Sequence, residues 1–175
     1  MSALVPSISL ALTLFFWAGS VGAQSGEIVC SVTENGALAR GTASVGRNGK
    51  EVGAGACGVA LSVPAGKYKV TLRLDGTLDN PSKTVEVEVS PGKRVPVAAD
   101  FKTGVLEVRI DSKGQRGPGI VMINRGSQRI GTLGSGVGAR LSAGQYEVIV
   151  RLGGEERRYP VDLRPGQRRL VRAQF

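Results

Sequence analysis

The feature that most constrains this sequence is an internal repeat. The segment from Gly26 to Leu74 aligns without a gap onto Gly104 to Leu152. Four extra residues then fall in the first copy around Thr77 to Pro81, after which the match resumes and closes with Phe101 on Phe175. A fixed period of this length indicates one structural unit built twice. It predicts two domains, residues 24–101 and 102–175, and makes the positions that differ between them informative.

Both copies alternate apolar and polar residues with the period of two that is typical of β-strands. The pattern is clearest from Tyr68 to Leu74 and recurs from Tyr146 to Leu152. Turn pairs such as Asn48-Gly49 separate the alternating segments. We therefore predict an all-β protein made of two tandem small antiparallel β-sandwich domains after an N-terminal signal peptide. Tyr68 and Tyr146 are predicted to anchor the two cores, the alternative being exposed residues that stack on a ligand.

Residues 1–23 have the character of a signal peptide. They carry no charged side chain, contain an apolar core from Ile8 to Ala18, and end in Val21-Gly22-Ala23, which is shaped like a signal-peptidase site. The core is shorter than the roughly 20 residues that span a bilayer. We predict cleavage before Gln24 and export to the periplasm, the outer surface or the medium, with no transmembrane segment in the mature chain. An uncleaved membrane anchor is the alternative, because no Lys or Arg precedes the core.

The two cysteines of the chain both lie in the first copy. Cys30 aligns with Val108 and Cys57 aligns with Ser135, so the second copy lacks both thiols. Joint loss is expected of two positions that face each other in the folded unit, and disulfides are common in exported proteins. We predict a Cys30–Cys57 disulfide, the alternative being two unrelated buried thiols.

Composition argues against catalysis. The chain contains no histidine, which excludes His-dependent catalytic triads and most zinc sites. Glycines 53, 55 and 58 fit a dinucleotide-binding pattern but lead into strand residues, so they are interpreted as a glycine-rich turn. Asp75, Asp79 and Asn80 could offer oxygen ligands to calcium, but we interpret their loop as a solvated hairpin turn. The sequence predicts no catalytic residue, no metal, no cofactor and no enzymatic activity.

Charge distinguishes the two copies. Residues 24–101 contain nine Lys or Arg and eight Asp or Glu, whereas residues 102–175 contain fourteen and six, and twelve of those fourteen cations are arginine. Arginine forms bidentate contacts with phosphate and carboxylate, so the second copy could bind an anionic polymer. The alternative is a soluble basic surface without a ligand. Strand alternation predicts that five candidate anion-binding residues face solvent: Arg151, Arg158, Arg164, Arg168 and Arg172.

The second copy also resembles the PEGA domain, a family similar to the carboxypeptidase regulatory-like and transthyretin-like sandwiches. The resemblance lies in the opening strand Gly104–Val108, the segment Arg116–Leu133 and the hairpin Leu141–Val148. Pro118-Gly119 replaces the full signature tetrapeptide, and no proline follows Thr132. The resemblance implies a non-catalytic accessory or binding module of the bacterial envelope.

Two functions follow as competing predictions. In the first, the basic second domain contacts an anionic glycan or another component of the envelope. In the second, the sandwiches are structural modules that dock onto an envelope protein complex through strand edges or loops. Nucleic acid is disfavoured as a partner, because the compartment is wrong and aromatic stacking residues are scarce.

Overall fold

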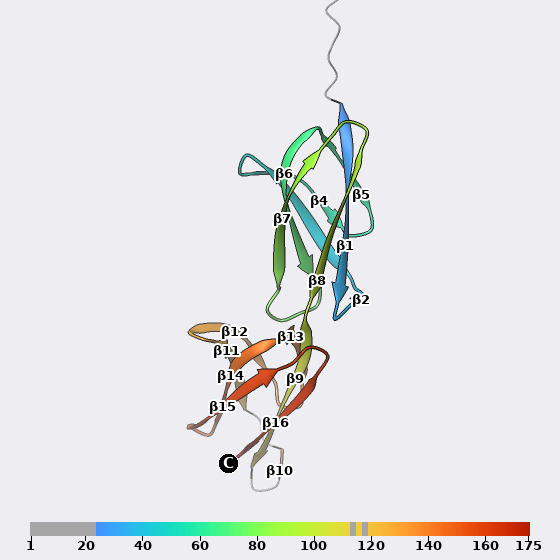
Figure 1. Ribbon diagram of the computed structural model, residues 1–175. Helices are drawn as coiled ribbons and strands as arrows, with labels where there is room; N and C mark the ends of the chain where they lie inside the picture. Colours follow the sequence, from blue (N-terminus) through green and yellow to red (C-terminus); the bar gives the residue numbers. More distant parts are fainter. Residues whose placement is uncertain (1–23, 113–114, 117–118) are drawn as a thin grey trace, which may run out of the picture.

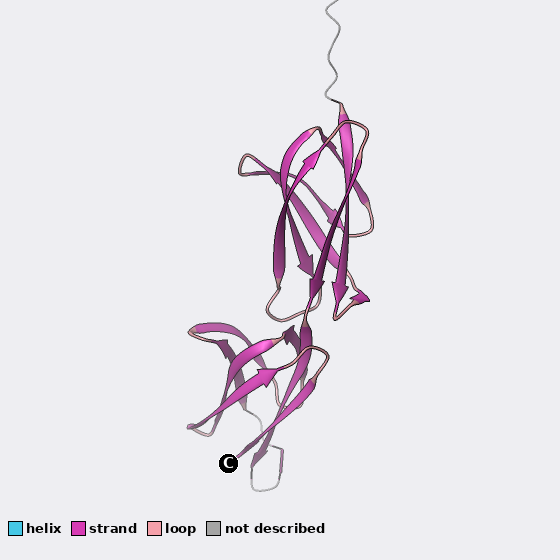
Figure 2. Cartoon of the chain, in the orientation of Figure 1, coloured by secondary structure: helices cyan, strands magenta, loops and turns pink. Residues whose placement is uncertain are grey.

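The computed structural model describes residues 24–112, 115–116 and 119–175, and these residues form strands, turns and loops without a helix (Figure 2). None of these residues therefore belongs to a helix that could cross a membrane. The predicted signal peptide, residues 1–23, lies outside the described residues. The all-β architecture of two tandem sandwiches is confirmed, and the described residues form four four-stranded sheets.

The first repeat, residues 24–101, supplies two of these sheets. In one sheet the opening strand β1 lies between β5 and the closing strand β8, and also pairs with the short β2. In the other the order is β4-β3-β6-β7, with antiparallel neighbours throughout. The bounds are β1 Ser25–Glu34, β2 Ala37–Leu38, β3 Gly41–Arg47, β4 Lys50–Ala56, β5 Ala60–Pro64, β6 Gly66–Leu74, β7 Ser82–Val89 and β8 Arg94–Phe101.

The second repeat, residues 102–175, has the same arrangement. The opening strand β9 lies between β13 and the closing strand β16 and pairs with the short β10, while the other sheet has the order β12-β11-β14-β15. The bounds are β9 Thr103–Ser112, β10 Gln115–Arg116, β11 Ile120–Arg125, β12 Gln128–Leu133, β13 Gly138–Ser142, β14 Gly144–Leu152, β15 Glu155–Leu163 and β16 Arg168–Gln174.

The closing strand of each repeat runs parallel to its opening strand, although all other neighbours are antiparallel. The chain changes sheets between β7 and β8, so β8 enters the first sheet at the end where β1 begins. Because β8 therefore finishes at the opposite end, and only Lys102 separates it from β9, the two sandwiches follow one another end to end (Figure 1).

Each repeat has its own core, formed by the inward residues of both sheets. Tyr68 and Tyr146 are 3% and 4% exposed, which confirms them as core residues and excludes the ligand-stacking alternative. Their hydroxyls donate to the carbonyl oxygens of Pro64 and Ser142, four residues upstream, so the polar tip of each ring is satisfied. The two cores are built on the same plan.

The predicted disulfide is confirmed. Cys30 of β1 is bonded to Cys57, which directly follows β4, and their Cα atoms lie 4.8 Å apart. In the second repeat the corresponding Ser135 hydroxyl accepts a hydrogen bond of 3.0 Å from the backbone N–H of Ile110. A hydrogen bond thus stands where the first repeat has a covalent link.

One local prediction is wrong. Gly53 and Gly55 belong to strand β4, and only Gly58 lies in a turn. Glycine supplies no side chain to the apolar-polar alternation, so this strand leaves no period-two signal in the sequence.

Candidate functional site

The four-residue insertion of the first repeat docks onto the second repeat. Leu78 donates its backbone N–H to the carbonyl oxygen of Arg140 at 2.8 Å, and its side chain packs against the second core beside Gly131. Both carboxylate oxygens of Asp79 accept from the N–H of Ser142, at 3.1 and 3.2 Å. The Asp79 side chain is only 5% exposed, so the interpretation of this loop as a solvated turn is wrong at that residue.

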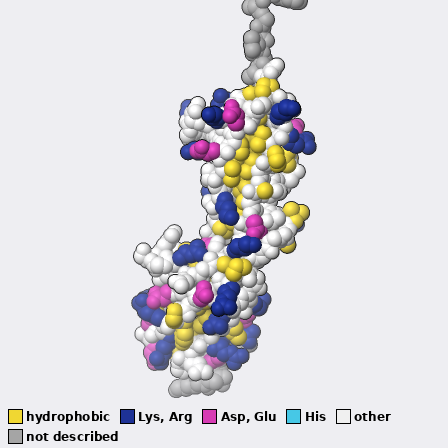
Figure 3. All heavy atoms as spheres, in the orientation of Figure 1, with side chains coloured by type: hydrophobic (Ala, Val, Ile, Leu, Met, Phe, Trp, Pro, Cys, Tyr) yellow, Lys and Arg dark blue, Asp and Glu magenta, His cyan; other side chains and the backbone are white. Residues whose placement is uncertain are grey.

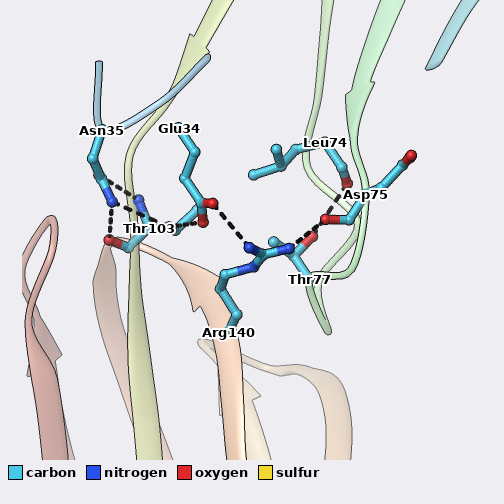
Figure 4. Close-up of polar contacts among 7 residues, drawn as sticks. All are labelled: Glu34, Asn35, Leu74, Asp75, Thr77, Thr103 and Arg140. Carbon is cyan, nitrogen blue, oxygen red and sulfur yellow. Dashed lines mark hydrogen bonds and ion pairs between the residues drawn. The ribbon is translucent and has the colours of Figure 1, made fainter. Parts of the chain in front are cut away.

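Arg140 is the centre of the junction between the repeats (Figure 4). One of its nitrogens donates to the Glu34 carboxylate at 2.9 Å, and another donates to the carbonyl oxygen of Asp75 at 2.6 Å. The Glu34 carboxylate also accepts from the hydroxyl of Thr103. Asn35 completes the junction, because its side chain exchanges two 3.0 Å hydrogen bonds with the backbone of Thr103. The two sandwiches are therefore joined by packed and hydrogen-bonded contacts in addition to the chain itself.

Asp79 also influences the second core. Burial, followed by the nearby Asp79 carboxylate, raises the pKa of Tyr146 to about 12. Arg125 lies over the Tyr146 ring at 4.9 Å and approaches Asp79 at 4.0 Å. Arg125 and Arg140 thus face the junction, and the charge of both is balanced by acids of the first repeat.

Another group of arginines lies on the outer face of the sheet β12-β11-β14-β15, where acidic partners balance them. Arg151 and Arg158 both bind the Glu156 carboxylate, each at 2.7 Å, and Arg158 also reaches Glu147 at 3.3 Å. Hydrogen bonds from Arg151 and then Arg158 lower the pKa of Glu156 below its ordinary value. This face is a mixed ion-pair network, and little of its positive charge is left for a ligand.

The arginines of this face also cover apolar side chains. Met122 and Ile149 point outward by strand alternation, yet they are only 4% and 6% exposed. Arg158 lies opposite Ile149 in the strand register, and Arg129 donates to the sulfur of Met122. Long arginine stems can cover apolar surface while the charged head stays in water. Part of the arginine excess therefore has a structural role.

The outer face of the opposite sheet contains a second balanced cluster. The Glu107 carboxylate accepts from Arg168 at 2.9 Å and from Arg109 at 2.8 Å. These two hydrogen bonds, Arg168 first, lower the pKa of Glu107. One carboxylate is thus shared by two guanidinium groups, so the cluster keeps a positive charge.

Three arginines that form no ion pair within the described part of the chain lie on β16 and on the turn before it. Arg164, Arg169 and Arg172 form no ion pair with any described residue, and all three are exposed. Arg172 lies beside Arg109 in the parallel register with β9. On the face drawn in Figure 3, blue and magenta side chains are interspersed over the lower, second repeat, so total charge alone does not locate this site. We call Arg164, Arg168, Arg169 and Arg172 the β16 arginines.

The five arginines predicted from the sequence are all exposed, but the structure does not bring them onto one face. Arg151 and Arg158 belong to one sheet, Arg168 and Arg172 to the other, and Arg164 to the turn between β15 and β16. Sequence reasoning missed Arg169, because strand alternation assigns it to the inward side. Arg169 is the second residue of β16, close to the Pro165-Gly166 turn, and side chains near the start of a strand can be exposed on either face. That position was the available signal.

The closing strand of the first repeat lacks most of these arginines. The positions equivalent to Arg164, Arg169 and Arg172 are Ser90, Val95 and Ala98. The position equivalent to Arg168 is Arg94, which binds Glu27 at 2.8 Å. Chemically, the β16 arginines can offer several forked donors to phosphate, sulfate or carboxylate groups, and they offer no nucleophile or general base.

No family model matches this sequence. No curated protein matches it either. Among solved structures, the Bacillus anthracis TIE protein is 15% identical with a TM-score of 0.42, over 87% of this chain and 34% of that one. A candidate adhesin from Bacteroides ovatus is 11% identical with a TM-score of 0.43, over 77% of this chain and 76% of that one.

The shaft pilin SpaA of Lactobacillus rhamnosus GG is 7% identical with a TM-score of 0.33, over 86% of this chain and 97% of that one. This chain spans about a third of the length of the TIE protein. At these identities and TM-scores, nothing about the function of this chain follows from the three likenesses.

Proposed function

We propose that this protein is an exported, non-enzymatic binding module whose second repeat contacts an acidic glycan or another anionic component of the cell envelope. The observation that carries the proposal is the placement of the β16 arginines. Three of the four have no acidic partner among the described residues, and the fourth shares Glu107 with Arg109. Exposed guanidinium groups that are not already neutralised are the ones available to an anionic ligand.

Two further observations support an exported module of the cell envelope. The Cys30–Cys57 disulfide is expected to persist in an oxidising compartment, which favours export. The resemblance of the second repeat to the PEGA domain favours an accessory module of the envelope. Docking onto an envelope protein complex remains the alternative function, and it uses strand edges or loops in place of charge.

The proposal is tested by retention of the chain 24–175 on a heparin column. In one variant Arg164, Arg168 and Arg172 become Gln. In the matched control Arg129, Arg151 and Arg158 become Gln, which removes the same charge from the outer face of the other sheet. We expect the first variant to elute at clearly lower salt than the wild type and the control to elute near the wild type, because screened surface contacts weaken with ionic strength. Equal shifts in the two variants would mean that only net charge matters, and the proposal would fail.

A further inference from the structure

The edge of β16 that faces away from β9 has no neighbouring strand among the described residues. The hydrogen-bond pattern identifies which backbone groups lie on it. Val105 donates to the carbonyl oxygen of Gln167 at 2.8 Å, and Phe175 donates to that of Asp111 at 3.0 Å. Backbone groups alternate sides along a strand, so the N–H and C=O groups of residues 169, 171 and 173 point toward β9. The N–H and C=O groups of Arg168, Leu170, Arg172 and Gln174 therefore point to the open edge.

The equivalent edge of the first repeat is closed in two ways. Pro96 occupies the position of Leu170, so an outward N–H is missing from β8. In addition, Lys83 of β7 donates to the outward carbonyl oxygen of Asp100 at 2.6 Å. Proline and lysine are common devices that prevent an edge strand from pairing with another chain. In β16 the first device is absent, because Leu170 replaces the proline. Arg157, which replaces Lys83, lies 5.6 Å from the Phe175 ring as Lys83 lies 5.5 Å from the Phe101 ring, but it donates to the Glu155 carboxylate and not to the closing strand.

The side chains around the open edge are basic. Arg168 and Arg172 lie on the same face of β16, four residues and thus about 13 Å of strand apart. Arg164 lies in the turn just before the strand, and Arg169 lies on the other face. An extended chain that pairs with β16 would place every second side chain on the face of Arg168 and Arg172, where carboxylates would be complementary to them.

We propose that the open edge of β16 binds an extended acidic segment of a partner polypeptide by strand addition. The backbone groups of Leu170 and Arg172 pair with the segment, and Arg168 and Arg172 receive its carboxylates. This recognition mode joins a backbone ladder, which gives affinity, to side-chain pairs, which give specificity. The inference rests on the proposed function for its arginines, and it identifies the anionic component as a polypeptide.

The discriminating variant is Leu170→Pro, which removes one outward N–H and leaves the charge unchanged. The first repeat carries proline at the same position, so the fold accommodates it there. Leu170→Ala is the control for the lost side chain. The probes are heparin and a capped synthetic peptide of alternating glutamate and valine, as long as β16. Peptide affinity is measured by calorimetry.

We expect Leu170→Pro to weaken peptide binding roughly tenfold, as loss of a backbone pair and steric hindrance at the edge would do. Heparin retention should stay at the wild-type value, and Leu170→Ala should bind the peptide nearly as tightly as the wild type. Replacing Arg164, Arg168 and Arg172 by Gln should weaken both interactions. Circular dichroism checks that each variant is folded.

Unchanged peptide affinity in Leu170→Pro would overturn strand addition while leaving the proposed function intact. Heparin retention that survives loss of the three arginines would overturn the proposed function itself. If the proline variant fails to fold, two peptides are tested on the wild type, one N-methylated at its odd residues and one at its even residues. Only one of these sets of N–H groups can face β16, so strand addition requires one of the two peptides to lose binding. A wild-type dimer that Leu170→Pro converts to a monomer would assign the edge to a second copy of this chain and overturn the acidic partner.

Discussion

The two repeats share a backbone plan but are stabilised by different means. The first repeat carries the Cys30–Cys57 disulfide, whereas the second has a hydrogen bond to Ser135 at that place. The first repeat also extends an insertion whose Leu78 packs against the core of the second. A small sandwich of this size is close to the lower limit for an independent core. The comparison indicates that the first repeat is stabilised from within and the second partly by its neighbour.

The sharpest test of this difference uses the equivalent tyrosines. Tyr146→Ala should destabilise the second repeat by about 4 kcal/mol, since it empties a buried aromatic site, and that is enough to unfold a marginal sandwich. Tyr68→Ala should leave the first repeat folded at ambient temperature while the disulfide is intact. Thermal unfolding followed by circular dichroism measures both. Equal loss of structure in the two variants would contradict the difference in stabilisation.

The disulfide itself provides the next test. The bond joins residues with a sequence separation of 27, and for a loop of this length the chain-entropy model gives about 3.6 kcal/mol. Replacing Cys30 and Cys57 by Val and Ser, the residues of the second repeat, should lower the unfolding midpoint of the first repeat by a corresponding amount. The second repeat should retain its own transition unless the Leu78 contact is lost with the first. Two alkylatable thiols in the non-reduced wild-type protein would contradict the cross-link.

The junction contact is expected to have a smaller effect. Leu78→Ala should lower the stability of the second repeat by about 2 kcal/mol, because the half-buried side chain contacts its core. Leu38→Ala is the matched control, since Leu38 is 85% exposed and its loss should change little. Hydrogen exchange resolved by mass spectrometry assigns the effect to one repeat. Increased exchange confined to the first repeat would show that the insertion does not support the second.

The repeat made much of this architecture predictable from sequence. Strand alternation placed the tyrosines in the core, and the joint absence of Cys30 and Cys57 from the second copy identified their pairing. The role of Asp79 could not be predicted, because docking of a loop on another domain leaves no local pattern. Which arginines are neutralised depends on strand register, which brings Glu156 opposite Arg151 and is set by the folded sheet.

The smallest effect concerns acid stability at the end of the first repeat. Asp100 binds Lys102 at 2.6 Å and also accepts from Thr33 and from the N–H of Gly36. These hydrogen bonds, that from Lys102 first, lower the pKa of Asp100 from 3.8 to about 2. The equivalent residue of the second repeat is Gln174, which does not titrate.

Because the folded-state pKa of Asp100 is lowered, its contribution to stability is complete above about pH 4 and is lost as the pH falls through about 2. Asp100→Asn should therefore be less stable than the wild type at neutral pH, and the difference should shrink between about pH 4 and pH 2. Urea unfolding across this range measures it. Gln174→Asn is the control at the equivalent position and should show the same small effect at every pH. The result that would contradict this is a difference in the free energy of unfolding between wild type and Asp100→Asn that stays constant down to pH 2. It would mean that the Asp100 carboxylate does not stabilise this end of the first repeat, so the two closing strands would not differ electrostatically at this position.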